Sequence, residues 1–364
     1  MTRIYLDHAA TTPLRPEARE AMLRGFEIWA NPSSPHAEGR KARAALEDAR
    51  ARVKGALGWD GEVIFTSGAS EALAIGLGRA KAKRRIVSAV EHDAVFRAAP
   101  DAEIVGVRPG RGGGLIDEAE LGDLLRQSQD RAVVAVQHVN SETGTLQPVG
   151  MLAEIVRESG GLLLSDCAQS AGKYPLPDAD MIVVSAHKLG GPVGIGALLV
   201  RDFAMLEPTG GQERGYRAGT ENLPAALGFA TALEAAGLPA TSMFPVWLDG
   251  PKSAYNALEN EFERLGGHDV LGGDPAINAI FMPNMAAQTQ LIRFDAAGIA
   301  VSAGSACSSG SLKPSRVLKA FGVSDEISTN TIRVSFGWTT TPEEVEQFCE
   351  AWLAMAREAA ERAA

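Results

Sequence analysis

Residues 181–200 read MIVVSAHKLGGPVGIGALLV, so two apolar runs flank a glycine-rich turn that contains a lysine. The runs 181–185 and 195–200 have the length of buried strands. Similar runs recur upstream, separated by amphipathic runs of helix length. We expect further strands at 62–66, 85–90, 103–107, 132–137 and 161–165, and helices at 37–57, 70–81, 117–128, 149–159 and 223–236. This alternation predicts an α/β fold with a mostly parallel sheet and helices on both faces.

The pattern changes over residues 237–252, GLPATSMFPVWLDGPK, where glycine, proline and serine break the periodicity. Beyond it we expect a helix at 252–264, strands at 277–282, 299–302 and 331–336, and a final helix from Pro342. Thr341 is the expected N-cap of that helix, because threonine is a favoured cap and proline a favoured first helical residue. These elements predict a second, smaller α+β domain.

Composition excludes several classes of protein. The chain has 364 residues, enough for a large core, and a net charge of −10, which argues against nucleic acid as a partner. Cys167, Cys307 and Cys349 have no C-x-x-C spacing, so neither a disulfide framework nor a zinc site is expected. No signal peptide or membrane-spanning run is visible. We therefore expect a cytoplasmic protein that binds neither a membrane nor a resident metal.

Reactive side chains follow the expected strands at the edge where open parallel sheets bind ligands. Lys188 follows the strand 181–185, and a lysine buried there loses water and charge, as an amine that forms a Schiff base must. The alternative is a lysine that reaches solvent. Asp166 follows the strand 161–165, and a buried carboxylate needs a partner such as a protonated pyridine nitrogen. The alternative is an aspartate that caps a turn.

Two further strand ends carry candidate groups. Thr66–Glu71 places small residues before a helix, which predicts either an anion site made by free amide groups or a plain capping box. His92 follows the strand 85–90, where an imidazole can stack on a flat ring and relay protons. A hydrogen-bonded surface histidine is the alternative for His92, and equally for His138.

Three other features indicate functional groups: the cysteines, a charged residue within an expected strand, and a segment rich in glycine and arginine. Cys307 lies in the small-residue stretch SAGSACSSGS (302–311), which predicts a mobile, exposed loop with a nucleophilic thiol, whereas Cys349 and Cys167 are expected to be buried. Arg333 interrupts an apolar strand, so its charge must be paired by a substrate carboxylate or by a structural glutamate. The segment 210–222 offers arginine and threonine donors suited to carboxylates and phosphates, or else a solvated loop.

Together these motifs resemble the cysteine desulfurases of the NifS/IscS type, which belong to class V of the pyridoxal phosphate (PLP)-dependent aminotransferases. The resemblance extends from the N-terminus to about residue 336. The matching stretches are YLDHAATTP (5–13), NPSSPH (31–36), TSGASE (66–71), EHDAV (91–95), HVNSETG (138–144), DCAQSAGK (166–173), SAHKLGGPVGIGAL (185–198), GGQERGYRAGTEN (210–222) and GIAVSAGSACSSGSLKPSRVL (298–318).

The resemblance implies the PLP-dependent transferase fold of the aspartate aminotransferase type, with a mostly parallel seven-stranded sheet in the large domain. We assign residues 16–240 to that domain, and residues 1–15 and 241–364 to a small α+β domain that carries the cysteine loop. The resemblance also implies a homodimer.

The resemblance implies roles for individual residues. Lys188 would form the Schiff base with PLP, His92 would stack on its ring, Asp166 would bind the pyridine nitrogen and Gln169 the ring oxygen. The phosphate would be held by Ala69, Ser70, Ser185, His187 and, from the neighbouring subunit, Thr220. Arg333 would hold the substrate carboxylate, with Asn31, Asn140 and Ser141 as further substrate-binding residues. Catalysis would rest on Lys188, His92 and Cys307, which takes the sulfur.

The sequence departs from the family pattern at several places. The usual SGAT is SGAS at 67–70, which keeps the hydroxyl group, and the helix start after Glu71 is about two residues shorter than usual. Ser141 replaces the second asparagine of the N-N-E motif, which normally approaches cofactor and substrate. Cys167 replaces a small residue, and nothing in the sequence explains it. We also expect the chain to lack the C-terminal tail with which some relatives dock a scaffold protein.

The implied activity is PLP-dependent removal of sulfur from L-cysteine, which yields L-alanine and a persulfide on Cys307. The sulfur would pass to an acceptor or scaffold protein for iron–sulfur cluster assembly or for the synthesis of other thio-cofactors. Transient contact of Cys307 with such a cluster is the one metal contact that we expect. The alternatives are a selenocysteine lyase or another class V PLP enzyme, and a catalytically silent relative that acts as a sulfur-relay or structural partner.

Overall fold

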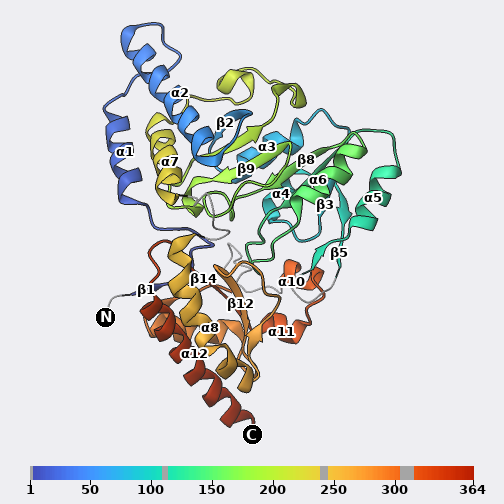
Figure 1. The fold of residues 1–364 in the computed structure, drawn as a ribbon, viewed down its shortest axis with the longest axis vertical. Coiled ribbons are helices and arrows are strands. Elements are labelled where there is room, and N and C mark those ends of the chain that lie inside the picture. Colours follow the sequence, from blue (N-terminus) through green and yellow to red (C-terminus); the bar gives the residue numbers. More distant parts are fainter. Residues whose placement is uncertain (1–2, 109–113, 238–244, 304–314) are drawn as a thin grey trace.

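The structure is a computed structural model and describes residues 3–108, 114–237, 245–303 and 315–364. Figure 1 shows two lobes, of which one holds the large sheet. The other holds the two ends of the chain together with α8 (Asp249–Arg264) and α12 (Pro342–Ala363).

The large sheet has seven strands in the order β2-β10-β9-β8-β7-β3-β4. They are β2 (Glu62–Thr66), β3 (Arg84–Ser88), β4 (Glu103–Val105), β7 (Ala132–Gln137), β8 (Leu162–Asp166), β9 (Met181–Ser185) and β10 (Gly196–Val200). Only β10 is antiparallel to its neighbours in this sheet. The prediction of a mostly parallel seven-stranded sheet is confirmed, and the carboxyl ends of six strands meet at one edge.

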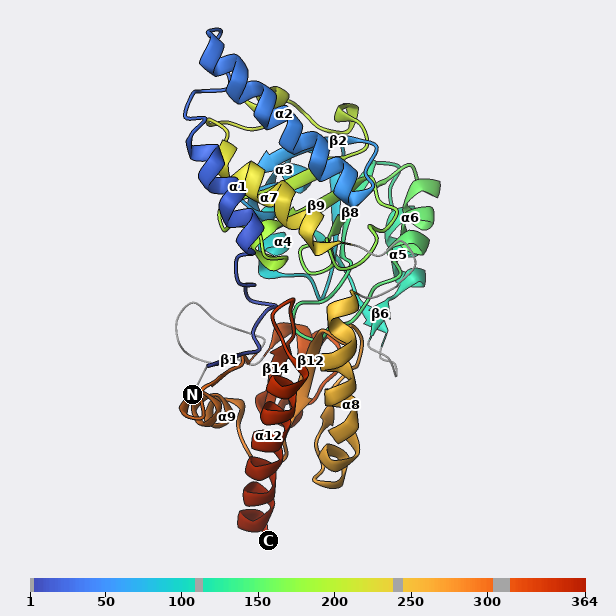
Figure 2. The ribbon, with the colours of Figure 1, turned by 60° about the vertical axis from the view of Figure 1, so that its left-hand side comes forward.

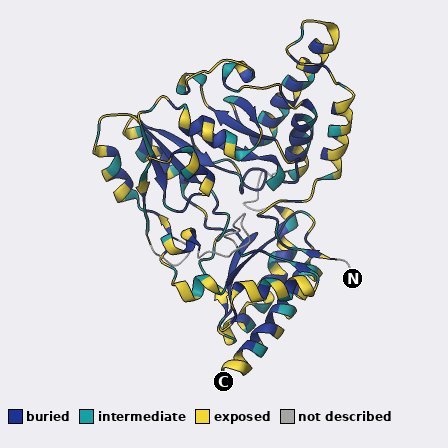
Figure 3. Ribbon diagram, turned by 180° about the vertical axis from the view of Figure 1, so that it is seen from behind, coloured by how far each residue is buried: buried dark blue, intermediate teal, exposed yellow. Residues whose placement is uncertain are grey.

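Helices cover both faces of this sheet, as predicted. One face packs against α2 (Ala37–Leu57), α5 (Glu118–Arg126), α6 (Val149–Glu158) and α7 (Leu223–Ala236), and the other against α3 (Ala69–Gly78) and α4 (Asp93–Ala98). Along β7, Val134 and Val136 face the first set while Val133 and Ala135 face the second, which is the period-2 alternation of a strand. The helix α1 (Pro16–Phe26) lies with α2 against α7 (Figure 2). Figure 3 shows the strands buried and the outer helix faces exposed.

Close packing fixes the position of α3. A Cβ atom on Gly76 would lie 2.3 Å from Leu164 Cδ1 of β8, so a larger residue would have to displace this buried side chain or the helix. The N-terminus of α3 is therefore held at the carboxyl edge of the sheet, directly after β2.

The second lobe has its own core. A three-stranded sheet, β11-β12-β14, packs against α8, α12 and α9 (Ala287–Ala296). Its strands are β11 (His268–Asp269), β12 (Ile277–Phe281) and β14 (Thr331–Ser335), and the short strand β1 (Ile4–Tyr5) pairs with β13 (Ile299–Ala300). The N-terminal residues Ile4 and Leu6 join this core. We propose the division into residues 16–240 and residues 1–15 with 241–364 on this basis.

The remaining elements are short. They are α10 (Arg316–Ala320), α11 (Asp325–Thr329), β5 (Val107–Arg108), β6 (Leu115–Ile116), and 3-10 turns at Ala186–Lys188, Phe203–Met205, Glu213–Gly215 and Val246–Leu248. The prediction for the last helix is confirmed: Thr341 caps α12 and forms a reciprocal capping box with Glu344. None of the helices in the described ranges combines the length and apolar character needed to cross a membrane.

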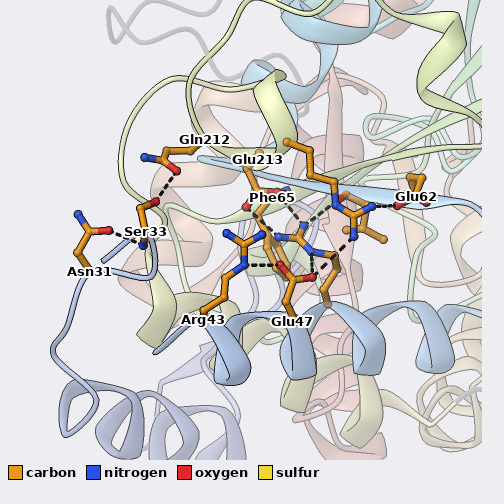
Figure 4. A network of polar contacts seen from close by, with 11 residues as sticks. Asn31, Ser33, Arg43, Glu47, Glu62, Phe65, Gln212 and Glu213 are labelled. Atoms are coloured by element: carbon orange, nitrogen blue, oxygen red, sulfur yellow. Dashed lines mark hydrogen bonds and ion pairs between the residues drawn. The ribbon is translucent and has the colours of Figure 1, made fainter. Parts of the chain in front are cut away.

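A buried ion pair ties α2 to the loop at 208–222 (Figure 4). Arg50 of α2 donates to both carboxylate oxygens of Glu213, at 2.7 and 3.1 Å, and the Phe65 amide donates to the same carboxylate at 2.8 Å. The two charged side chains are 6% and 1% exposed. Glu213 and Arg214 have positive φ angles of 47° and 57°. This strained turn is therefore held by a desolvated, fully bonded carboxylate.

Replacing the buried carboxylate gives a test of this anchor. Glu213→Gln should lower the free energy of unfolding by about 3–5 kcal/mol, because Arg50 would keep a buried charge without a counter-ion. Glu62→Gln is the matched control, since Glu62 pairs with Arg214 nearer the surface and its loss should cost no more than about 1 kcal/mol. Urea denaturation followed by circular dichroism measures both, and equal losses would contradict the assignment.

Candidate functional site

A cavity of about 930 Å³ opens at the carboxyl edge of the large sheet. Its walls come from the turns after β2, β3, β7, β8 and β9, and from Arg316, Val317 and Arg333 of the second lobe. This volume is in the range of small-molecule and cofactor sites. Ten predicted site residues line it: Ala69, Ser70, His92, Ser141, Asp166, Gln169, Ser185, His187, Lys188 and Arg333. A smaller hollow of about 410 Å³ near Trp59 and Arg201 contains none of them.

Lys188 lies in the tight turn that follows β9. Its Nζ donates to the carbonyl oxygen of Ala9, and the Thr12 hydroxyl donates to the Lys188 carbonyl at 3.2 Å. Burial lowers the pKa of Lys188 to about 8, and the charges of Arg333 and Lys173 act in the same direction. About a tenth of this amine is therefore unprotonated, and hence nucleophilic, at pH 7, far more than for an ordinary lysine.

Asp166 is the last residue of β8 and is 8% exposed. Burial raises the pKa of Asp166, while a 2.9 Å hydrogen bond from the Ala168 amide and the nearby His92 and Lys188 oppose the rise. Within the protein the carboxylate has no direct ion pair among the described residues. The cavity therefore favours a ligand with a cationic or protonated nitrogen at this wall.

His92 caps α4, and its Nδ1 accepts a hydrogen bond from the Ala94 amide at 3.1 Å. The proton of the neutral ring therefore lies on Nε2. Burial lowers the pKa of His92, which keeps the ring neutral. Gln169 donates from Nε2 to the Ala9 carbonyl at 2.9 Å, whereas its buried Oε1 has no hydrogen-bond partner within the described ranges.

The wall at α3 is suited to an anion. The helix begins after Gly68, which has no side chain to cap the first amide groups, and Ser67, Gly68, Ala69 and Ser70 all line the cavity. Glu71 accepts from the Ser67 amide and pairs with Arg217 at 3.1 Å, so it does not cap these later amides. Ser185 and His187 line the cavity as well. Burial lowers the pKa of His187 to about 4, so this imidazole is neutral.

Arg333 of β14 forms the wall that belongs to the second lobe, and it is 5% exposed. Its Nη1 donates to the Ser141 carbonyl at 2.9 Å and its Nη2 to Asp7 Oδ1 at 2.7 Å. Its Nε is buried and has no partner in the part of the chain that the structure describes. Nη1 and Nη2 each keep one further N–H beyond these bonds, and such donors in a cavity wall are suited to a ligand acceptor such as a carboxylate.

Three of the other predicted site residues, Asn140, Asn31 and Thr220, do not line this cavity. Asn140 lies beside it, but its carboxamide is used within the chain, where it donates to Val90 O at 3.1 Å and accepts from the amides of Glu142 and Thr143. Asn31 is exposed and accepts from the Ser33 amide at 2.8 Å (Figure 4). Thr220 is exposed as well, and its predicted role concerns a second subunit. Cys307 lies outside the described residues.

Several cavity residues have no predicted role, among them the charged residues Glu91, Glu142 and Arg316. Burial raises the pKa of Glu91 to about 8, although its Oε1 accepts from the Gln137 amide at 2.8 Å; Asp166 adds to the rise. Glu142 accepts from the Ser315 hydroxyl at 2.6 Å. Glu91 precedes His92 and Glu142 follows Ser141 in the sequence, so both acids could have been found by examining the neighbours of the predicted residues. Arg316 comes from a helix of the other lobe, and the strand pattern gives no sign of it.

Comparisons with known proteins agree with this architecture. The aminotransferase class-V family model matches residues 4–348. The chain is 36% identical to a cysteine desulfurase IscS of Dictyoglomus turgidum (strain DSM 6724 / Z-1310), over 94% of this chain and 91% of the relative. It is 37% identical to a cysteine desulfurase of Cereibacter sphaeroides, over 96% and 95% of the two chains.

Two solved structures are similar over nearly their full length. The X-ray structure of a NifS-like protein from Rickettsia africae ESF-5 has a TM-score of 0.86 at 29% identity and covers 98% of this chain and 99% of that one. A structure described as SspA in complex with cysteine has a TM-score of 0.76 at 29% identity, covering 92% and 99%. The predicted fold class is confirmed, and the chain belongs to the aminotransferase class-V family.

Proposed function

We propose that this protein is a PLP-dependent cysteine desulfurase, which converts L-cysteine to L-alanine and keeps the sulfur as a persulfide on Cys307. One observation carries the proposal: Lys188, Asp166 and Arg333, an amine, an acid and a guanidinium, line a single cavity. The relatives named cysteine desulfurase over nearly the whole chain support the reaction class. The structural relative described in complex with cysteine supports the substrate.

The residues of the cavity fit the cofactor. The amine of Lys188, with its lowered pKa, suits an aldehyde, and Asp166 suits a protonated pyridine nitrogen. The unpartnered Oε1 of Gln169 would accept from the ring hydroxyl, and the neutral ring of His92 offers a surface for stacking. The uncapped N-terminus of α3, with Ser185, suits the phosphate group. When bound, PLP withdraws electrons from the substrate α-carbon.

The chain's own residues then have separate tasks. Arg333 would hold the substrate carboxylate through the remaining N–H groups of Nη1 and Nη2, and so orient the α-carbon. The Lys188 amine would remove the α-proton and return it, since its pKa of about 8 suits a group that both takes and gives a proton. Asp166 would keep the proton on the ring nitrogen. The neutral His92, protonated on Nε2, would serve as a proton carrier.

Cys307 would take the sulfur. Its thiolate attacks the substrate sulfur and forms a sulfur–sulfur bond, while the bonding pair of the broken carbon–sulfur bond stays with the carbon skeleton, which takes up a proton and leaves as alanine. Cys307 follows Ser302 by five residues, and Ser302 exchanges backbone hydrogen bonds with Arg333, at 3.1 and 2.6 Å. A chain of that length spans at most about 18 Å, which supports access of the thiol to the cavity.

The remaining parts of the proposal concern partners and compartment. Leu23 and Phe26 of α1 and the nearby Trp29 are 54%, 62% and 81% exposed, which supports a homodimer that would cover them. In that dimer Thr220 would reach the partner's phosphate site.

The sulfur acceptor would be a scaffold or carrier protein. The free thiol that this chemistry needs supports a reducing, cytoplasmic location.

The lowered pKa of Lys188 predicts how the protein takes up its cofactor. Protein stripped of PLP should bind added PLP at a rate that rises with pH to a midpoint near 8, because only the neutral amine reacts. Stopped-flow absorbance measures the rate. Lys188→Ala should show no borohydride-trapped PLP on the protein, whereas Lys83→Ala, an exposed lysine paired with Asp130, should behave as the wild type. A midpoint above pH 10 would contradict the assignment.

Replacing the sulfur-accepting thiol should separate cofactor binding from turnover. Cys307→Ser should keep the visible absorbance of bound PLP and lose alanine formation from L-cysteine by about 100-fold or more. Cys349→Ala is the control: Cys349 is buried in the second core, burial raises its pKa to about 12, and its loss should leave turnover intact. Sustained alanine and sulfide release by Cys307→Ser would remove the persulfide step. Turnover of selenocysteine but not of cysteine would overturn the desulfurase assignment.

A further inference from the structure

We propose that Asp7 is a built-in counter-ion of Arg333, a positioning residue that weakens the hold of this arginine on a carboxylate ligand and so sets the affinity for the substrate. The substrate half of this inference rests on the proposed function. The ion pair itself, and its effect on carboxylates in general, does not.

The pair is held by the backbone. Leu6 O accepts from the Ser335 amide at 2.8 Å and Ser335 O accepts from the His8 amide at 3.4 Å, so residues 6–8 run alongside β14, the strand that carries Arg333. Within this frame Arg333 Nη2 donates to Asp7 Oδ1 at 2.7 Å. The two side chains are 6% and 22% exposed. This is an ion pair fixed by two adjacent extended segments, unlike a surface pair between mobile side chains.

A carboxylate in the cavity need not displace Asp7. A guanidinium has five N–H donors, of which Asp7 and the Ser141 carbonyl take one each. One N–H of Nη1 and one of Nη2 therefore have no hydrogen bond within the described residues, whereas Nε is buried away from solvent. Arg333 lines the cavity, and Asp7 is not among the lining residues. A ligand would therefore bind the free donors of Arg333 while Asp7 stays in place, so that one guanidinium serves two carboxylates.

A ligand carboxylate binds Arg333 less strongly because the Asp7 carboxylate already lies on the same guanidinium. The charge of Asp7 offsets that of Arg333 and repels an anion placed on the same group. Its field extends into the cavity, since Asp7 opposes the lowering of the pKa of Lys188. The other charges that act on Lys188 are those of Arg333, Lys173 and Asp166. An interaction with the carboxylate persists through the reaction, so it should act on KM more than on kcat.

The test uses the full-length, PLP-loaded protein and propionate, a carboxylate without an amine that cannot react with PLP. Asp7→Asn keeps the shape and a hydrogen-bond acceptor but removes the charge. It should bind propionate about tenfold more tightly than the wild type, as measured by the rise of Tm with concentration. Its Tm without propionate should be lower, because Arg333 loses its counter-ion, and propionate should restore part of that loss. KM for L-cysteine should fall by a similar factor with kcat within about twofold.

Controls link the effect to charge and to Arg333. Asp130→Asn removes an exposed partner of Lys83 and should change neither Tm response nor KM. The double variant Asp7→Asn/Arg333→Gln should lose the response to propionate. Asp7→Glu, which keeps the charge and guards against poor folding of Asp7→Asn, should bind propionate as the wild type does; a tenfold gain there would overturn the proposal.

The outcomes also separate this inference from the proposed function. Unchanged or weaker propionate binding by Asp7→Asn would overturn the counter-ion role, whatever the enzyme does with cysteine. Tighter propionate binding without any cysteine turnover by the wild type would support the counter-ion role and refute the desulfurase.

Discussion

The loss of water around charged groups at the carboxyl edge of the large sheet is the constraint on which this structure depends. A desolvated charge must find a partner in the chain or in a ligand. Arg50 and Glu213 satisfy one another, with the Phe65 amide as a further donor, and they hold the fold. Lys188, Asp166 and Arg333 are only partly satisfied by the chain, and all three face one cavity. The same physics thus distinguishes a structural charge from one that awaits a ligand.

Most of the large sheet could be predicted because β7, β8, β9 and β10 are almost entirely apolar and helices such as α2, predicted at 37–57, are amphipathic. The helices α1, α4 and α9 were not predicted. The helix α9 was missed, since Gln290 is fully buried and donates to the carbonyls of Met285 and Asn330, which hides the apolar periodicity. The run 103–107 divides into β4 and β5 because the Gly106 amide donates to the Glu120 carboxylate at 2.8 Å.

The candidate site could be predicted to the extent that it follows strand ends, as Lys188 and Asp166 do. The substrate-binding role implied for Asn140 could not be judged from the sequence. Its side-chain oxygen accepts hydrogen bonds from the Glu142 and Thr143 amides within the same turn. Arg333 was recognised as a charge in need of a partner, but the sequence left open which one. Asp7, which lies 326 residues away, becomes its neighbour only through tertiary packing. Cys307 remains a prediction, since it lies outside the described residues.

The passage of residues 4–12 between the two lobes has a consequence for biosynthesis. This segment is made well before its partners, since it pairs with β13, adjoins β14 and hydrogen bonds to Lys188. Contacts of such long range form late, because the intervening chain must first be made and folded. The large sheet is complete in sequence by Val200, whereas the cavity lacks Arg333 until β14 has been made. A nascent chain can therefore present a folded sheet without a working site, which postpones sulfur chemistry until β14 has folded into the second lobe.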